Sequence, residues 1–101
     1  MRSSDINTTE VTQMTQLKGH WIYNHRDPEG NIVYIGRGSS YCGNRSRDTT
    51  RTIEDHSRLL KEGALSINIV VHGLEYHECK KMELELIKHI NPIYNTQGRT
   101  Q

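Results

Sequence analysis

The sequence predicts a small α+β domain, in which helices pack on an antiparallel sheet of about three strands in the order β-β-α-β-α. Three observations predict it: two β-favouring runs joined by turn residues, a later stretch of alternating apolar residues, and a closing segment with helical periodicity. A chain of 101 residues is long enough for one domain only. Because just 33% of the residues are apolar and the mean hydropathy is −0.79, the core must be thin.

The first predicted element is a β-hairpin. Strand-favouring residues run from Trp21 to Tyr23 and again from Ile32 to Ile35. Residues 27–31 between them include Asp, Pro, Gly and Asn, which favour a turn. A glycine-rich loop is expected from Gly36 to Gly43.

The second half of the chain alternates helix and strand signals. A polar, arginine-bearing helix is predicted between Asn44 and Lys61, followed by a third strand from Leu65 to His72. The clearest helix runs from Glu75 to Ile90 and must stop before Asn91-Pro92, because proline disfavours helix in the residue before it. Ile93-Tyr94 is expected to form a short edge segment.

Composition limits the setting of the protein. No apolar run approaches the roughly 20 residues that span a bilayer, and the N-terminus has no apolar signal region, so we expect a soluble, cytoplasmic protein with no membrane partner. Cys42 and Cys79 form no CxxC pair, which argues against a disulfide framework or a zinc site. The net charge of +1 neither demands nor excludes nucleic acid. Residues 1–17 are expected to be a flexible arm, residues 18–96 the domain and residues 97–101 a tail.

Strand alternation sorts the hairpin side chains between two faces. The simplest pairing puts the aliphatic side chains of both strands on one face, so that Ile22, Val33 and Ile35 lie in the core. Tyr23 and Tyr34 then lie side by side on the opposite face, next to the glycine-rich loop. Two interpretations remain open: a cross-strand aromatic pair that only stabilises the hairpin, or a pair of phenols that serves a site.

The phase of the last helix singles out one carboxylate. At about 100° per residue, Glu83 falls within the apolar stripe that contains Cys79 and Ile87, whereas Glu85 points to the lysine-rich, solvated side. A carboxylate in an apolar stripe is costly unless it is paired or binds a metal ion. Glu83 is therefore expected either to bind a metal or to pair with an arginine.

Four fragments in order resemble the signature of the GIY-YIG nuclease superfamily. They are Trp21-Ile22-Tyr23, Tyr34-Ile35-Gly36 after ten intervening residues, Gly43-Asn44-Arg45, and the Glu-x-x-Leu-Ile pattern of Glu83 to Ile87 followed by Pro92-Ile93-Tyr94-Asn95. The sequence departs from the signature at the first glycine, where it has tryptophan. The resemblance covers about residues 19–95 and implies the same α+β fold.

The resemblance also implies a metal-dependent endonuclease that hydrolyses phosphodiester bonds in DNA. By analogy Glu83 would hold a single divalent ion, Mg²⁺ or Mn²⁺, because one carboxylate completed by water and phosphate suits these ions. Arg45 would contact the scissile phosphate, with Arg47 as the alternative. Tyr23 would act as general base or orient the attacking water, and Tyr34 would support it. To act as a base near neutrality Tyr23 needs its pKa lowered by nearby positive charge, which Arg45 and the metal ion could supply.

Other residues complete the expected site. Asn95 would orient Glu83 or the nucleotide. Family members often carry a histidine where this chain has Thr49, so His56 is a substitute candidate for a base or phosphate ligand, although it could simply be a solvated histidine. Phosphate contacts are expected from four further basic positions, three of them on one face of the predicted helix: Arg37, Arg47, Arg51 and Arg58.

The alternative function is a nucleic-acid-binding or interaction module that has kept this scaffold and lost catalysis. The joint presence of both tyrosines, Arg45, Glu83 and Asn95 favours the nuclease. A lone catalytic domain suggests a phage or mobile-element origin, and the protein could act as a monomer or a homodimer.

Overall fold

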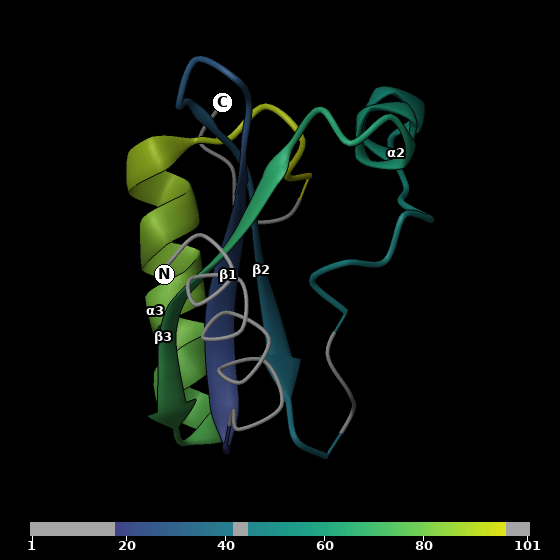
Figure 1. Cartoon of the computed structure of the whole chain (residues 1–101). Coiled ribbons are helices and arrows are strands. Elements are labelled where there is room, and N and C mark those ends of the chain that lie inside the picture. The colour runs from purple at the N-terminus through teal and green to yellow at the C-terminus, as the bar shows by residue number, and fades with distance from the viewer. Residues whose placement is uncertain (1–17, 42–44, 97–101) are drawn as a thin grey trace, which may run out of the picture.

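The computed structural model describes residues 18–41 and 45–96 (Figure 1). Within these residues, three strands and two helices follow one another in the predicted order: β1 (His20–Arg26), β2 (Ile32–Ser39), α2 (Glu54–Lys61), β3 (Ser66–Leu74) and α3 (Tyr76–Ile90). The predicted arm and tail, Cys42 and the Gly43-Asn44 part of the arginine motif lie outside the described residues. Neither described helix has the length and apolar content that a membrane-spanning helix needs.

The described strands form an antiparallel sheet in the order β2-β1-β3, so the first strand of the chain is the central one. In the β1–β2 hairpin Tyr23 pairs with Gly36 and His25 with Tyr34. The predicted turn is held by the Asp27 carboxylate, which accepts hydrogen bonds from the backbone N–H groups of Glu29 and Asn31, both at 2.9 Å. The hairpin is therefore confirmed, with strands longer than the sequence indicates.

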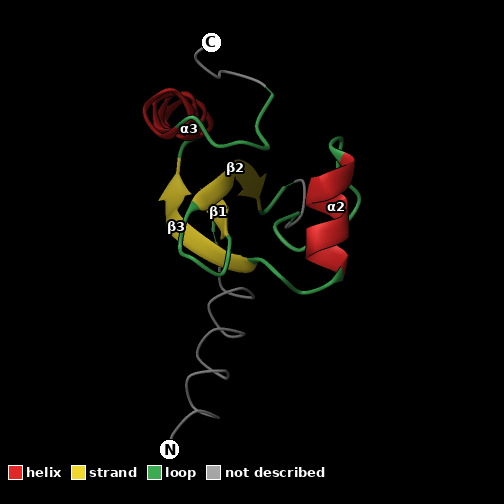
Figure 2. Ribbon diagram, turned by 90° about the horizontal axis from the view of Figure 1, so that it is seen from above, coloured by secondary structure: helices red, strands yellow, loops and turns green. Residues whose placement is uncertain are grey.

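Helix α3 covers one face of the sheet and forms the main core with it. Ile22 and Ile35 of the hairpin pack against Cys79 and Ile87 of the helix, all at most 2% exposed. Val33, also predicted to be in the core, is buried in a separate cluster under Leu60 of α2. Figure 2 shows α3 lying along the sheet and α2 standing apart from it on the side of β2.

Local sequence sets both ends of α3. Glu75 and Glu78 form a capping box at its start, in which each side chain bonds to the other residue's backbone N–H. At its end Asn91 adopts the left-handed conformation with φ of 53°, and Pro92 follows. The predicted span of this helix is confirmed to within one residue.

The glycine-rich loop predicted from Gly36 begins later than expected, because β2 continues to Ser39. Gly36 and Gly38 are part of the strand, where they lie beneath the rings of Tyr23 and Trp21. A Cβ atom at Gly36 would lie 2.5 Å from the Tyr23 hydroxyl oxygen. These glycines therefore make room for aromatic rings on a paired strand instead of ending it.

The helix expected somewhere between Asn44 and Lys61 is α2, but it begins only at Glu54, so Arg45, Arg47 and Arg51 are not part of it. Residues 45–53 take an irregular path, in which the Asp48 carboxylate accepts a hydrogen bond from the Thr50 backbone N–H at 3.0 Å. Three threonines in this segment also have low helix propensity. Arg47 and Arg51 consequently do not share a helix face with Arg58.

Helix α2 is joined to the sheet by apolar packing and by a hydrogen bond between two histidines. Leu60 packs on Val33 and Leu65, and His56 is hydrogen bonded to His25 of β1, with Nε2 and Nδ1 2.9 Å apart. Both imidazoles are at most 1% exposed. A buried histidine pair thus holds the helix and the preceding segment against the hairpin.

The hydrogen bonds of this pair fix its tautomers. His25 Nε2 lies 2.7 Å from the carbonyl oxygen of Ser46, which can only accept, so Nε2 carries the proton. His25 Nδ1 then accepts, and His56 Nε2 donates to it. Burial lowers the pKa of each histidine to about 4, so both rings are neutral near pH 7.

Replacing Gly38 by alanine should destabilise the fold by about 1–3 kcal/mol, because the new methyl group would overlap the buried indole of Trp21. Urea unfolding measures the effect. Ser40→Ala, at an exposed position just beyond the strand, is the control and should change the free energy of unfolding by less than about 0.5 kcal/mol. Equal stability of the two variants would contradict this packing.

The histidine pair should make stability depend on pH. Its folded pKa of about 4 lies below the value of 6.5 for an unperturbed histidine, so the unfolded chain binds more protons between these values. The stabilisation is complete above about pH 6.5 and is lost as the pH falls towards 4. Urea unfolding between pH 6.5 and 5 should show this slope, in a range above the titration of most carboxylates.

A matched pair of variants isolates the source of that slope. His56→Gln keeps a donor near His25 Nδ1 but cannot titrate, so it should lower the slope by about half. His77→Gln, at an exposed position, should leave the slope unchanged. The same slope in wild type and His56→Gln would show that the pair does not control it.

Candidate active site

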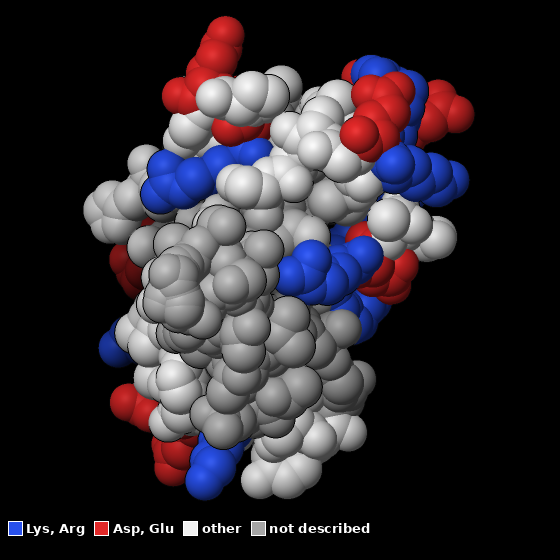
Figure 3. Space-filling view, viewed as in Figure 1, with Lys and Arg blue, Asp and Glu red and all other residues white. Residues whose placement is uncertain are grey.

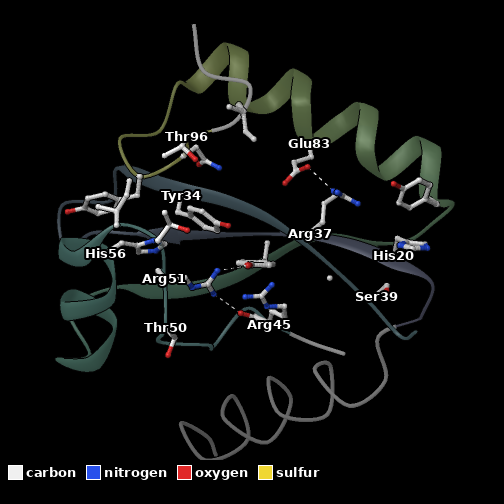
Figure 4. A pocket seen from close by; sticks show the side chains of 18 residues that line it. His20, Tyr34, Arg37, Ser39, Arg45, Thr50, Arg51, His56, Glu83 and Thr96 are labelled. Atoms are coloured by element: carbon white, nitrogen blue, oxygen red, sulfur yellow. Dashed lines mark hydrogen bonds and ion pairs between the residues drawn. The ribbon is translucent and has the colours of Figure 1, made fainter. Parts of the chain in front are cut away.

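A cavity of about 470 Å³ lies along the β2 side of the sheet, and most of the predicted site residues line it (Figure 4). Its walls come from both hairpin strands, residues 45–53, α2, α3 and residues 94–96. These segments are far apart in the sequence. The cavity is therefore a product of the tertiary fold.

Glu83 projects from α3 into this cavity and is 9% exposed, as the helix phase predicts. Its Oε1 accepts a hydrogen bond from Nε of Arg37 at 2.8 Å, forming an ion pair (Figure 4). Glu85 lies on the outer side, with a side chain 55% exposed. The predicted contrast between the two glutamates is confirmed. Arg37, predicted to contact DNA, instead neutralises Glu83 in this structure.

Tyr23 and Tyr34 lie on the same face of the hairpin, with ring centroids 6.1 Å apart, as alternation predicts. Tyr23 is only 2% exposed, whereas Tyr34 is partly exposed. Burial, and then the proximity of Tyr34, raises the pKa of Tyr23 to about 12, although Arg51 opposes the shift. Burial therefore outweighs the positive charge of Arg51, and this arginine alone does not lower the pKa of Tyr23.

Arg51 is the arginine that contacts the tyrosine pair. Its Nη1 donates to the Tyr23 hydroxyl at 3.2 Å, and its Cζ lies 5.2 Å from the Tyr34 ring centroid. Nε donates to the backbone oxygen of Asp48 at 2.7 Å and Nη2 to that of Arg45 at 2.6 Å. One guanidinium thus fixes the course of residues 45–51 and brings positive charge to the cavity.

The two arginines favoured by the sequence lie farther out. Arg45 lines the cavity, is exposed, and pairs with Asp48 at 3.5 Å. Arg47 is exposed and is not among the residues that line the cavity. The expected positive charge beside Tyr23 comes from Arg51 and not from Arg45, because the segment is irregular instead of helical.

Arg58 lies on exposed α2, outside the cavity lining. It forms ion pairs with Asp55 at 3.5 Å and Glu62 at 3.4 Å. Figure 3 shows basic and acidic side chains mixed over this helix, at the upper right. A surface with both signs of charge gives little support to the predicted role of Arg58 in phosphate binding.

Asn95 is 6% exposed, and its side chain bonds to the hairpin instead of orienting Glu83. Its Oδ1 accepts from the Ile35 backbone N–H and its Nδ2 donates to the Ile35 oxygen, both at 2.8 Å. The Tyr94 backbone N–H adds a bond to the oxygen of Val33 at 2.9 Å. No strand forms at the predicted Ile93-Tyr94 edge segment, yet these bonds cover the outer edge of β2.

His56 is not a solvated histidine. Its ring stacks on Tyr94 with centroids 5.0 Å apart and lies 4.6 Å from that of Tyr34. With a pKa of about 4 it is a weak base, which argues against the predicted role as proton acceptor. His25, to which the sequence assigns no function, lies two residues after Tyr23 on the same strand face, and this spacing is the signal that could have found it.

The fold of this chain resembles that of solved nuclease domains. No family model and no curated protein matches the sequence. Two structures of the GIY-YIG N-terminal endonuclease domain of UvrC from Thermotoga maritima match the fold. A tyrosine-to-phenylalanine mutant bound to its catalytic divalent cation has a TM-score of 0.63 and 22% identity, over 89% of this chain and 97% of that chain. The magnesium-bound domain has a TM-score of 0.62 and 20% identity, over 88% and 97%. The protein described here therefore has the fold of the GIY-YIG endonuclease domain.

Proposed function

We propose that the protein is a metal-dependent endonuclease that hydrolyses phosphodiester bonds in DNA. The observation that carries the proposal is that one carboxylate, three arginines and the Tyr23–Tyr34 pair line a single cavity of a nuclease fold. Phosphodiester hydrolysis needs neutralisation of the phosphoryl oxygens, an activated water and help for the leaving oxygen. These side chains can supply each of the three.

Glu83 is the residue that would hold the metal ion. It is the only carboxylate among the described residues that line the cavity. Residues 18–41 and 45–96 contain no cluster of three or more His, Cys, Asp or Glu, as a zinc site would require. A single carboxylate completed by water and phosphate oxygens fits Mg²⁺ or Mn²⁺. When bound, such an ion would neutralise phosphate charge and lower the pKa of a coordinated water.

The phosphate contact is assigned to Arg51, with Arg45 beside it. A guanidinium has five N–H donors, and Arg51 uses three on described residues, which leaves two for a phosphate. Arg45 and its partner Asp48 have side chains 64% and 39% exposed, so their ion pair is weak and can be exchanged for a phosphate. Both arginines line the cavity that contains Glu83.

The two tyrosines are assigned different roles. Tyr34, the more exposed phenol, lines the cavity and would orient a water there or, as the phenolate, accept its proton. Tyr23 is buried and keeps its proton at neutral pH, because its pKa is raised to about 12. Its hydroxyl instead accepts a hydrogen bond from Arg51 and so positions that guanidinium.

Glu83→Gln should reduce Mg²⁺-dependent nicking of supercoiled plasmid DNA by roughly a thousandfold, because the amide keeps an acceptor for Arg37 but loses the charge that holds a cation. Glu85→Gln, on the solvated side of α3, is the matched control and should nick at the wild-type rate. Equal loss in both variants would disprove the assignment. A wild-type protein that binds DNA but never cleaves it with Mg²⁺ or Mn²⁺ would favour the catalytically impaired binding module.

Tyr34→Phe should lower the single-turnover rate by about a hundred- to ten-thousandfold, the usual effect of losing a positioned proton acceptor. Tyr23→Phe should lower it by only about tenfold, since it loses one hydrogen bond to Arg51. Between about pH 7 and 10 Tyr23→Phe should keep the wild-type pH profile, because Tyr23 does not titrate there. A changed profile in Tyr23→Phe with a normal one in Tyr34→Phe would exchange the two roles.

A further inference from the structure

Three aromatic rings lie together beside the cavity, at the end away from His56. These rings, of His20, Tyr41 and Tyr76, form the aromatic patch. The His20 ring lies between the two tyrosines, with its centroid 5.8 Å from that of Tyr41 and 5.5 Å from that of Tyr76. Figure 4 shows His20 beyond Arg37 and Glu83, with His56 at the opposite end. His20 and Tyr76 both line the cavity, so the patch is continuous with the proposed active site.

The patch presents unusual aromatic surface to solvent. Tyr41 is 82% exposed and Tyr76 is 43% exposed, whereas Tyr23 of the hairpin is 2% exposed. Tyr41 lies two residues after the end of β2. Its ring belongs to none of the three core clusters formed by the described residues. Packing of the fold therefore does not account for its ring.

Two cations flank the patch. Arg37 places its Cζ 5.6 Å from the Tyr76 ring centroid, and Lys80 places its Nζ 5.9 Å from the same centroid. Arg37 also pairs with Glu83, so it connects the patch to the proposed metal ligand. Proteins bind single-stranded nucleic acid with this combination of groups: exposed aromatic rings stack on the bases, and basic side chains attract the phosphates.

We propose that the aromatic patch is a stacking platform for an unpaired base of the DNA strand that is cut. The inference rests on the proposed action on DNA and narrows its substrate class. In an intact duplex each base is already stacked and paired, so placing one on Tyr41 requires it to be extruded. DNA with unpaired bases next to the scissile phosphate avoids that cost and is the favoured substrate class.

The test compares a fluorescent single strand of about twelve thymidines with a duplex of the same length, by anisotropy in EDTA so that no cleavage occurs. Tyr41→Ala should weaken binding of the single strand by roughly ten- to a hundredfold, the usual effect of removing one stacking aromatic, and change duplex binding by less than about twofold. Tyr41→Phe, which keeps a ring, should bind as the wild type does. A single 2-aminopurine in the strand should be quenched by wild type and Tyr41→Phe but not by Tyr41→Ala.

Val70→Ala is the control for loss of an exposed apolar side chain, because Val70 is 50% exposed on β3 and does not line this cavity. Its affinity for the single strand should match that of wild type. The platform is disproved if wild type does not bind the single strand, if Tyr41→Ala binds it normally, or if Tyr41→Ala weakens the duplex as much. If the protein binds the single strand and quenches 2-aminopurine but never cleaves plasmid DNA, the proposed nuclease activity is rejected and the stacking platform is kept. If Tyr41→Ala cleaves single-stranded and duplex DNA as the wild type does, the stacking platform alone is rejected.

Discussion

The fold depends on burying the central strand on both of its faces. β1 is paired at both edges, and its residues from Trp21 to His25 are all buried. One face meets α3 through Ile22, and the other carries the aromatic and imidazole rings. A chain with so few apolar residues can do this only if long polar side chains cover the second face. The candidate site is the consequence, because those polar groups are arranged around Tyr23.

Glycines on β2 give the second face its shape. Gly36 and Gly38 allow the rings of Tyr23 and Trp21 to lie flat across a strand that is still paired. The outer edge of this strand is closed by the Asn95 side chain, which bonds to both backbone groups of Ile35 much as a neighbouring strand would. The backbone groups of Ile35 are thereby hydrogen bonded, although the strand lies at the edge of the sheet.

Positive charge predominates along the cavity. Among the described residues that line it, three are arginines and one is a carboxylate, whereas α2 carries both signs of charge in exposed ion pairs. A nearly neutral protein can thus present a basic surface to a polyanion in one place. With only 20–22% identity to the matched nuclease domains, the likeness lies in the fold, and the roles of individual side chains here come from their own contacts.

The sequence by itself determined the features that depend on local periodicity. Alternation in the hairpin put Tyr23 and Tyr34 on one face, and the helical phase separated buried Glu83 from exposed Glu85. Only the tertiary structure decided which arginine meets the tyrosines. Residues 45–53 have no periodicity, and Arg51 bonds both to nearby backbone oxygens and to the distant Tyr23 hydroxyl. The buried pair of His25 and His56 was equally hidden, since a contact between residues 31 positions apart has no signature in either local segment.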